Sequence, residues 1–411
     1  MPTLWQYIRI KTGSASSLDQ AKQRFQRCRF PFLSFHIRSV AQAQSQFISL
    51  LTGPENIQPR GVKFTSDYGL QALPVILEMC NKTELEEIVI YEHALLEDLP
   101  VPNLKRLFIH TIPNSWLTTP PPPKLTALVV TKPVHWTLLQ YILANSPCLQ
   151  RAMLWVAESG KTFSGLASES PSSKSGLHLL PYLLSFGIVS ESEEDLPLDL
   201  LRNFSLPVLH SFEYYTGRKD HQWMVWPTSL GLLSGVRRLT IQSHSQALIE
   251  IFEATPVLEE LRISWNSYDL PGVFQPLIDL PSSDPQRSIL LRLKVLQLSW
   301  ESWQIGIQDA APQLRQLAQA WSTPTPGRPN PITHFKLVFC NREHHRAKRL
   351  WDAIVQDGPL DLDLEVICDL QWGSVHIPIA CETYEFLFTE VKRRAVLQGD
   401  GTWKVRYAPA Y

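Results

Sequence analysis

The hydrophobic positions along the chain follow one recurring motif of three apolar residues. Two variable residues separate the first from the second, and one variable residue separates the second from the third. In an extended strand alternate side chains point to opposite faces, so the last two apolar residues share one face. The motif therefore predicts many short parallel strands that lie side by side. Its ten copies are Leu85-Ile88-Ile90, Leu104-Leu107-Ile109, Leu125-Leu128-Val130, Leu149-Ala152-Leu154, Leu183-Phe186-Ile188, Leu209-Phe212-Tyr214, Val236-Leu239-Ile241, Leu258-Leu261-Ile263, Leu293-Leu296-Leu298 and Ile332-Phe335-Leu337.

A proline precedes several copies in the sequence Pro-x-Leu, where the leucine is the first residue of the motif. Proline cannot continue a helix, and it biases the preceding residue toward extended geometry. We therefore expect each of these prolines to end one connection and to lead into the next strand. They are Pro102, Pro123, Pro147, Pro181, Pro207 and Pro256.

The segments between the strands include four with apolar residues at helical spacing, at residues 136–145, 246–254, 313–321 and 346–355. Strands that alternate with helices predict an α/β fold. Because the motif recurs in units of irregular length, the pattern favours an irregular leucine-rich-repeat-like solenoid, with short parallel strands joined by helical or loop crossovers.

The two ends of the chain depart from the motif. Solenoids need terminal segments that cover their otherwise exposed core, so we expect caps at both ends. The predicted organisation is an N-terminal cap over residues 1–50, a solenoid over residues 51–358 and a C-terminal cap over residues 359–411.

Composition narrows the class of protein. The 38 Lys and Arg residues nearly balance the 39 Asp and Glu residues, which argues against a chain dedicated to nucleic acid. The six cysteines form no C-x-x-C pair, and we recognise no leader and no long apolar run. We therefore expect a monomer in the cytoplasm or nucleus, with no membrane partner. The 32 prolines and 18 glycines are unusual for a nucleotide-binding α/β enzyme.

Motifs for chemistry are weak. Gly160-Lys161-Thr162 matches the end of a phosphate loop, but that motif needs a glycine where Trp155 stands. Cys340 and His344-His345 lack a second pair at zinc-finger spacing. We therefore predict no cofactor, no metal and no catalytic residue, and interpret these residues as parts of polar loops and strands.

Two basic clusters allow two interpretations. Residues 342–349 and Lys392-Arg393-Arg394 could bind an acidic partner or act as a nuclear address, and a solvated helix face is the favoured interpretation for both.

The residues between the apolar strand positions form the candidate binding surface. In a solenoid they align on one concave face, and aromatic and arginine side chains dominate the energetics of protein interfaces. The alternative is that helices or loops cover part of this face, so that some of its aromatic residues belong to the core. The candidates are Tyr91, Arg106, Phe108, His110, Arg151, Trp155, Glu213, Tyr215, Arg238, Glu260 and Arg262.

The N-terminal sequence resembles a known family. Pro2-Thr3-Leu4-Trp5 and the residues after it are similar to the closing P-x-L-W turn of an F-box, and residues 21–37 resemble the first repeat behind it. The family is that of fungal F-box proteins with degenerate leucine-rich repeats. The earlier helix of an F-box, which opens with L-P-x-E and grips the linker subunit of a cullin-based ubiquitin ligase, is missing from this sequence.

The resemblance implies a non-catalytic protein-recognition scaffold, similar to the substrate-binding part of a ubiquitin-ligase adaptor. Its partner would be a protein of unknown identity, with the cullin-ligase linker subunit as a second partner only if an upstream F-box exists. Two alternatives stay open: a hydrolase-like α/β enzyme, and a stand-alone repeat protein with no role in ubiquitin transfer. A nucleic-acid or membrane-surface binder is a weaker alternative.

Overall fold

The protein is seen here in a computed structural model of the 411-residue chain, which divides into two compact units, Met1–Leu183 and Leu184–Tyr411. The domain boundaries predicted at residues 50 and 358 stay predictions. The residues that the structure describes are 7–11, 19–20, 23, 32–36, 45, 49, 58–65, 80, 84–90, 99, 101–157, 178–190, 204–216, 233–242, 252–265, 270–279, 290–300, 311–324, 332–340, 349, 352–354, 363–369, 392–397 and 403–408.

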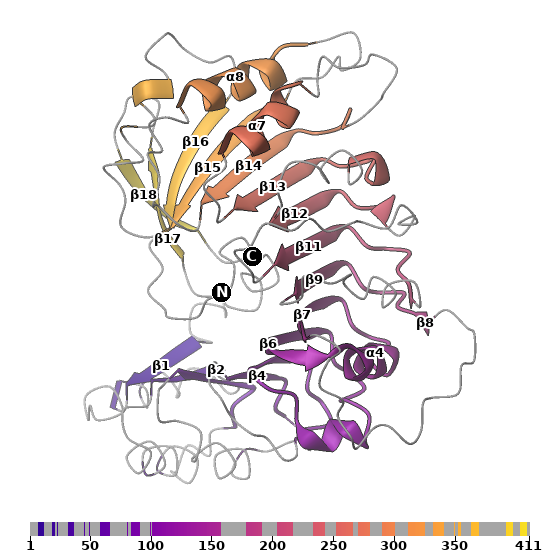
Figure 1. Ribbon diagram of the computed structural model, residues 1–411. Coiled ribbons are helices and arrows are strands. Elements are labelled where there is room, and N and C mark those ends of the chain that lie inside the picture. The colour runs from indigo at the N-terminus through magenta and orange to yellow at the C-terminus, as the bar shows by residue number, and fades with distance from the viewer. Residues whose placement is uncertain are drawn as a thin grey trace. The chain divides into compact units, whose positions relative to one another are not determined.

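Unit 1 contains a row of parallel strands that pair in chain order (Figure 1). They are β1 (Tyr7–Lys11), β2 (Phe32–His36), β3 (Gly61–Thr65), β4 (Glu87–Ile90), β5 (Arg106–Ile109), β6 (Ala127–His135) and β7 (Arg151–Ala157). A short 3-10 helix, η3 (Asn114–Leu117), precedes β6, and helix α4 (Trp136–Ala144) packs against β6 and β7. The two-residue strand β8 (His178–Leu179) is the last described strand of this unit.

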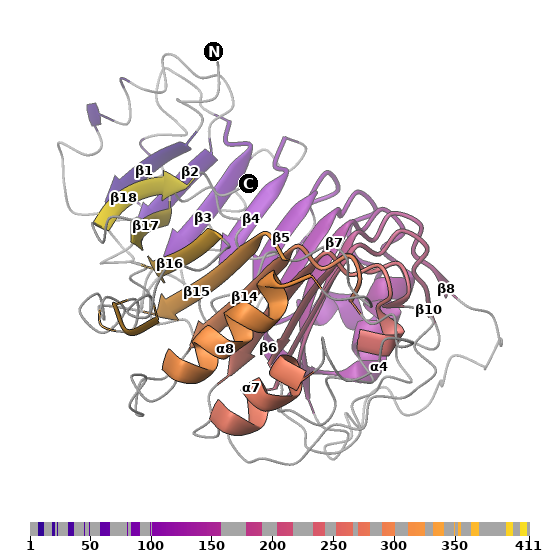
Figure 2. The same cartoon turned by 90° about the horizontal axis from the view of Figure 1, so that it is seen from above.

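Unit 2 repeats this arrangement. Its parallel strands are β9 (Ser185–Ser190), β11 (Ser211–Thr216), β12 (Arg238–Gln242), β13 (Glu260–Trp265), β14 (Val295–Trp300), β15 (His334–Cys340) and β16 (Asp363–Asp369). Strands β17 (Lys392–Leu397) and β18 (Trp403–Ala408) follow in antiparallel pairing, and β10 (Phe204–Ser205) is a two-residue strand. Helices α7 (Leu270–Asp279) and α8 (Ala311–Ser322) lie beside each other on one side of the strands (Figure 2).

The prediction of an α/β fold with parallel strands is confirmed, and every copy of the repeat motif falls on a strand. All the apolar residues of these copies are at most 2 % exposed. Equivalent positions pair across neighbouring strands, as Leu239 does with Leu261 and Leu261 with Leu296. Each motif therefore buries its apolar side chains against those of the adjacent copies.

The prolines of the Pro-x-Leu sequences lie in tight turns that lead into the strands, as predicted. In each turn the amide of the leucine donates a hydrogen bond to the carbonyl three residues earlier, as Leu104 does to Val101 at 3.2 Å and Leu258 to Thr255 at 3.2 Å. Proline suits the second position of such a turn because its φ is fixed near −65° and it has no N–H to satisfy. Val236 and Leu293 make the same hydrogen bond in turns without proline.

A second backbone contact fixes where each strand begins. The carbonyl of the residue just before one strand accepts hydrogen bonds from two consecutive amides at the start of the next. The Lys105 carbonyl accepts from Thr126 and Ala127 at 2.7 and 2.9 Å. The other carbonyls with this double contact are those of Arg60, Glu86, Thr126, Leu184, His210, Arg237, Glu259 and Lys294.

Two of the predicted helices are confirmed along their length, the segments 136–145 and 313–321, which form α4 and α8. Within the other two, the structure describes helical residues 252–254, 349 and 352–354. Helix α7 was not predicted, because Pro276 stands inside it and obscures its pattern. Its buried face contacts α8, where the Trp321 indole N–H donates to the Leu277 carbonyl at 2.8 Å.

Other elements also differ from expectation. Strand β3 was not predicted because the motif's first apolar position is occupied by Pro59. The interpretation of Lys392-Arg393-Arg394 as a helix face is wrong, since these residues begin β17. The strand continues through Ala395-Val396-Leu397, and every residue of β17 pairs with a residue of β18. Most of the basic cluster at 342–349 and all of residues 158–177 lie outside the described residues.

The burial of the motif residues gives a direct stability test. The change Leu128→Ala, at a fully buried position of β6, is expected to lower the free energy of unfolding by about 2–5 kcal/mol, because it leaves a cavity. The control Leu179→Ala, at a residue that is 58 % exposed, is expected to change it by less than about 0.5 kcal/mol. Urea denaturation measures both, and equal losses would contradict the assigned core.

Candidate functional site

The candidate residues lie on the strand face opposite to that of the motif's paired apolar residues. The starts of neighbouring strands align there, so that Glu87 pairs with Arg106 in unit 1 and Arg238 with Glu260 in unit 2. Two positions further along, Phe108 lies between Val89 and Val129 on the adjacent strands. The predicted alignment of these side chains is therefore present within each unit.

Three of the candidates are buried rather than exposed. Phe108, Glu213 and Tyr215 are fully buried, and Phe108 and Glu213 are flanked on both sides by in-register neighbours. The sequence did contain a signal for this burial. Consecutive apolar residues, as in Ile88-Val89-Ile90, are typical of parallel strands buried on both faces rather than on one.

The other candidates keep some exposure. Arg238 is exposed, and Tyr91 lies outside the described residues. The partly exposed candidates are Arg106, His110, Arg151, Trp155, Glu260 and Arg262.

The central part of this face differs in chemistry between the two units. From β4 to β7 in unit 1 the third strand positions are apolar, at Val89, Phe108, Val129 and Met153, all buried, and Lys63 of β3 stands in register with Val89. From β11 to β15 in unit 2 the corresponding row is polar. It consists of Glu213, Thr240, Arg262, Gln297 and Lys336, and the Tyr215 hydroxyl donates to the Glu213 carboxylate at 3.1 Å.

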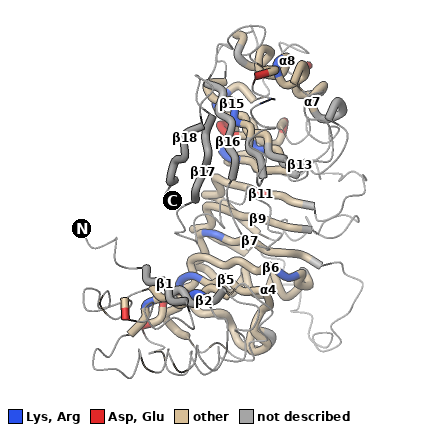
Figure 3. The backbone as a smooth tube through the Cα atoms, turned by 90° about the vertical axis from the view of Figure 1, so that its left-hand side faces the viewer, with Lys and Arg blue, Asp and Glu red and all other residues tan. Residues whose placement is uncertain are grey.

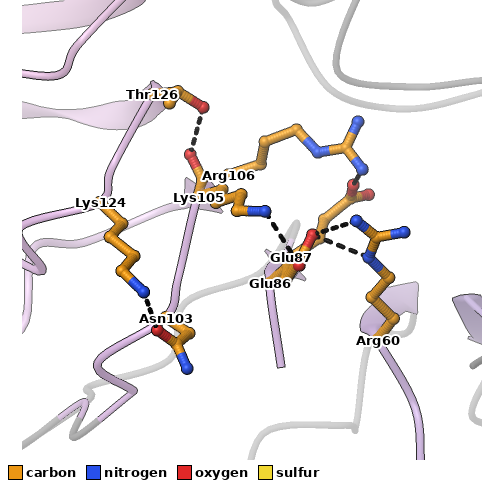
Figure 4. A network of polar contacts seen from close by, with 8 residues as sticks. All are labelled: Arg60, Glu86, Glu87, Asn103, Lys105, Arg106, Lys124 and Thr126. Carbon is orange, nitrogen blue, oxygen red and sulfur yellow. Dashed lines mark hydrogen bonds and ion pairs between the residues drawn. The ribbon is translucent and has the colours of Figure 1, made fainter. Parts of the chain in front are cut away.

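Ion pairs at the strand starts form what we call the strand-start ladder of unit 1, made of Arg60, Glu86 and Lys105 (Figure 4). These are the residues just before β3, β4 and β5. Glu86 accepts from Arg60 at 2.7 Å and from Lys105 at 2.9 Å. Burial opposes ionisation of Glu86, but these hydrogen bonds and charges outweigh it and lower its pKa.

The next residue, Glu87, has the opposite electrostatic balance. It pairs with Arg106 at 2.5 Å, also shown in Figure 4, yet burial dominates over Arg106 and Lys63 and raises the pKa of Glu87. The Arg106 guanidinium also lies 5.4 Å from the centre of the Phe32 ring, in cation–π geometry. That ring covers Gly61, where a Cβ atom would collide with it, so β3 needs glycine at this position.

Unit 2 has an equivalent ladder at the residues just before β12, β13 and β14. In the strand-start ladder of unit 2, which we define as Arg237, Glu259 and Lys294, the Glu259 carboxylate lies 3.5 Å from Arg237 and 3.2 Å from Lys294. Beside it, Glu260 pairs with Arg238 at 3.6 Å and with Arg262 at 2.8 Å. Opposite charges thus neighbour each other across adjacent strands of each unit; Figure 3 marks Lys and Arg in blue and Asp and Glu in red along the backbone.

The ladder residues outside the strands were not among the predicted site residues. Both ladders have the order basic, acidic, basic at the position before consecutive strands. That order could have been found in the sequence by aligning the motif copies and comparing the residue immediately after the first apolar position. Lys105 follows Leu104 in this way, as Arg237 follows Val236 and Lys294 follows Leu293.

Within the described part of the chain, no group of three or more His, Cys, Asp or Glu residues is placed to hold a metal ion. Over the same residues, no helix is long and apolar enough to cross a membrane. The prediction that no metal or cofactor is bound stays a prediction.

Comparison with known proteins adds no relative. No family model matches the sequence, and no curated protein matches it. The F-box resemblance therefore rests on the residues of the N-terminal segment alone.

Glu86 and Glu87 provide a test of the ladder's electrostatics, because their opposite pKa shifts predict opposite pH dependence. A lowered pKa stabilises the fold above the ordinary value of 4.5, and this stabilisation is lost in acid. A raised pKa has the reverse effect, so stability is lost as the pH rises above 4.5. Relative to the wild type, Glu86→Gln should thus lose stability and Glu87→Gln should gain stability as the pH rises.

Urea denaturation between about pH 3 and about pH 7 measures these differences. For Glu86→Gln we expect a loss of about 1 kcal/mol or less at neutral pH, because the ion pairs are partly exposed. The same sign for both variants would contradict the assignment.

The cysteines allow a separate test of burial. Cys80 is 4 % exposed, and burial raises its pKa to about 12, so almost none of it is thiolate at neutral pH. Cys148 is partly exposed. Iodoacetamide should therefore alkylate Cys148 in the folded protein and leave Cys80 unmodified, as read by mass spectrometry. Both should react in urea, and rapid labelling of folded Cys80 would show that its burial is wrong.

Proposed function

We propose that the protein is a non-catalytic recognition scaffold, an irregular leucine-rich-repeat-like solenoid with terminal caps that binds a protein partner on the face described above. The observation that supports this proposal is the constant backbone geometry of the strand starts. The same turn and the same double hydrogen bond recur from copy to copy. Repeat proteins use such a constant frame to present variable side chains on one face.

The side chains on that face vary while the frame does not. At the first strand position the sequence changes from Glu87 to Arg106 and Ala127 in unit 1, and from Ser211 to Arg238 and Glu260 in unit 2. The buried apolar positions behind them keep their chemistry throughout. Of these first-position residues, Arg106, Arg238 and Glu260 keep some exposure, and varied chemistry at such positions on a constant core favours recognition over a purely structural role.

The surface that we assign to the partner consists of the exposed and partly exposed candidates. In unit 1 these include Arg151 and Trp155 on β7, and in unit 2 Arg238 and Arg262 on β12 and β13. Arginine and tryptophan are the residues most often found at the energetic centres of interfaces. The buried candidates Phe108, Glu213 and Tyr215 would support this surface from beneath and would not contact the partner.

By the F-box resemblance, the partner would be a ubiquitin-ligase substrate, and the linker subunit of a cullin-based ligase would be a second partner only if an upstream F-box exists. Affinity capture from a native lysate can compare this chain with a form extended upstream in its own gene. Recovery of cullin-ligase subunits only by the extended form would support the adaptor role. Recovery by neither form would leave a stand-alone repeat protein as the better hypothesis.

The recognition surface itself is tested with two double variants, Arg151→Ala with Trp155→Ala and Arg238→Ala with Arg262→Ala. At least one pair should reduce the captured amount of a specific partner about tenfold or more, which corresponds to about 1.4 kcal/mol. Quantitative mass spectrometry of the captured proteins measures this loss.

Controls for the surface test are Lys124→Ala and Arg292→Ala, exposed residues in the turns before β6 and β14. They should leave capture unchanged, and circular dichroism should confirm that all variants are folded. If neither double variant reduces the capture of any protein, the proposed surface is wrong.

A further inference from the structure

The exposure of the paired charges in unit 2 is asymmetric. In the strand-start ladder, the Arg237 and Lys294 side chains are 57 % and 63 % exposed, whereas Glu259 between them is 32 % exposed. In the adjacent pair, Arg238 is 59 % exposed and Glu260 is 16 % exposed. The carboxylates thus lie deeper than the cations, and the groups that face solvent are predominantly basic.

Within the strand-start ladder of unit 2 the charges do not balance. Glu259 is shared between Arg237 and Lys294. The ladder therefore has twice as many positive as negative charges. Long basic side chains extend toward water in many proteins, but that tendency alone leaves a surplus of one positive charge within the ladder.

Among the described starts of the parallel strands β9 to β15, the exposed Lys and Arg residues lie at β12 and β14, on either side of β13. The residues just before β11 and β15 are His210 and Thr333. The first positions of these two strands are Ser211, in register with Arg238, and His334, in register with Val295.

The spacing of the two ladder cations suits an extended polypeptide. Arg237 and Lys294 belong to strands that are two apart, which places their backbones about 10 Å from each other at the usual strand separation of about 4.8 Å. A peptide in the extended polyproline II conformation has three residues per turn and rises about 3.1 Å per residue, so that residues three apart lie on the same side of it, about 9 Å from each other. Acidic residues at positions i and i+3 of a segment that crosses the strands would meet both cations.

We propose that the strand-start ladder of unit 2, together with Arg238, binds an extended acidic segment of a partner protein. This inference rests on the proposed recognition function and specifies the chemistry of its partner. Glutamates of the segment would accept hydrogen bonds from Arg237, Arg238 and Lys294 while Glu259 and Glu260 hold those side chains in place. Because the cations are already ordered by these pairs, binding loses less side-chain entropy than it would with unpaired lysines and arginines.

The test uses a fluorescein-labelled peptide with glutamate at every third position in a glycine–serine background, and the same peptide with glutamine instead. Fluorescence anisotropy with the purified full chain should show binding of the glutamate peptide, weakened by added salt, and little binding of the glutamine peptide. The triple variant Arg237→Gln, Arg238→Gln and Lys294→Gln should weaken binding about tenfold or more.

A matched control has the same loss of charge in unit 1, namely Arg60→Gln, Lys105→Gln and Lys124→Gln. It should retain binding of the glutamate peptide within about twofold. Equal loss in both triple variants would overturn the proposal, because it would show attraction to the chain's overall charge rather than to this site. Tighter binding of a single-stranded oligonucleotide with the same number of charges would also overturn it, in favour of nucleic acid.

The peptide experiment and the capture experiment can fail separately. Peptide binding that depends on the ladder, without any captured partner, would leave the site intact and remove support for the cellular recognition role. A captured partner that is insensitive to the triple variant would support recognition and overturn the acidic-segment proposal.

Discussion

The double hydrogen bond at the strand starts is the contact on which the rest of the structure depends. One carbonyl accepts two consecutive amides of the next strand, and this fixes the register between them. Side chains at equivalent positions must then lie beside one another, since a shift by a single residue would exchange the two faces of the strand. The aligned leucines of the core and the aligned charges of the two ladders both follow from this one contact. In unit 1, Lys105 takes part in both the backbone contact and the ladder, because its carbonyl joins β5 to β6 while its ammonium group binds Glu86.

Much of this fold could be predicted from sequence because its signals are local. The motif and its prolines identified ten strands and their turns, and helical spacing identified α4 and α8. Strand β3 and helix α7 were missed where proline replaces or interrupts the expected pattern. The exposure of the second strand face was not predictable from alternation alone. Phe108 is buried because its neighbours in register are Val89 and Val129, and register across strands is a property of the fold rather than of one segment.

The two units show that one backbone arrangement can support two different interiors. Unit 1 buries Val89, Phe108 and Met153 on the second face, whereas unit 2 buries Glu213 and Thr240 at equivalent positions. A buried carboxyl group needs partners, and Tyr215 supplies one from the same strand. A polar row restricts the positions of its side chains more than an apolar row does, because each hydrogen-bond donor must meet its acceptor. The polar row of unit 2 lies on strands β11 to β15, which include the strands with the basic strand starts.

The connections between strands differ in length while the turn before each strand does not. The chain passes from Ile109 to Ala127 by a short connection, and from Trp265 to Val295 by a much longer one that contains α7. The entropic cost of closing a loop grows only slowly with its length. New segments can therefore be inserted between a strand and the following turn without disturbing the alignment of the sheet. This architecture gives the chain sites where evolution, or an engineer, can add a helix or a loop while the existing surface is preserved.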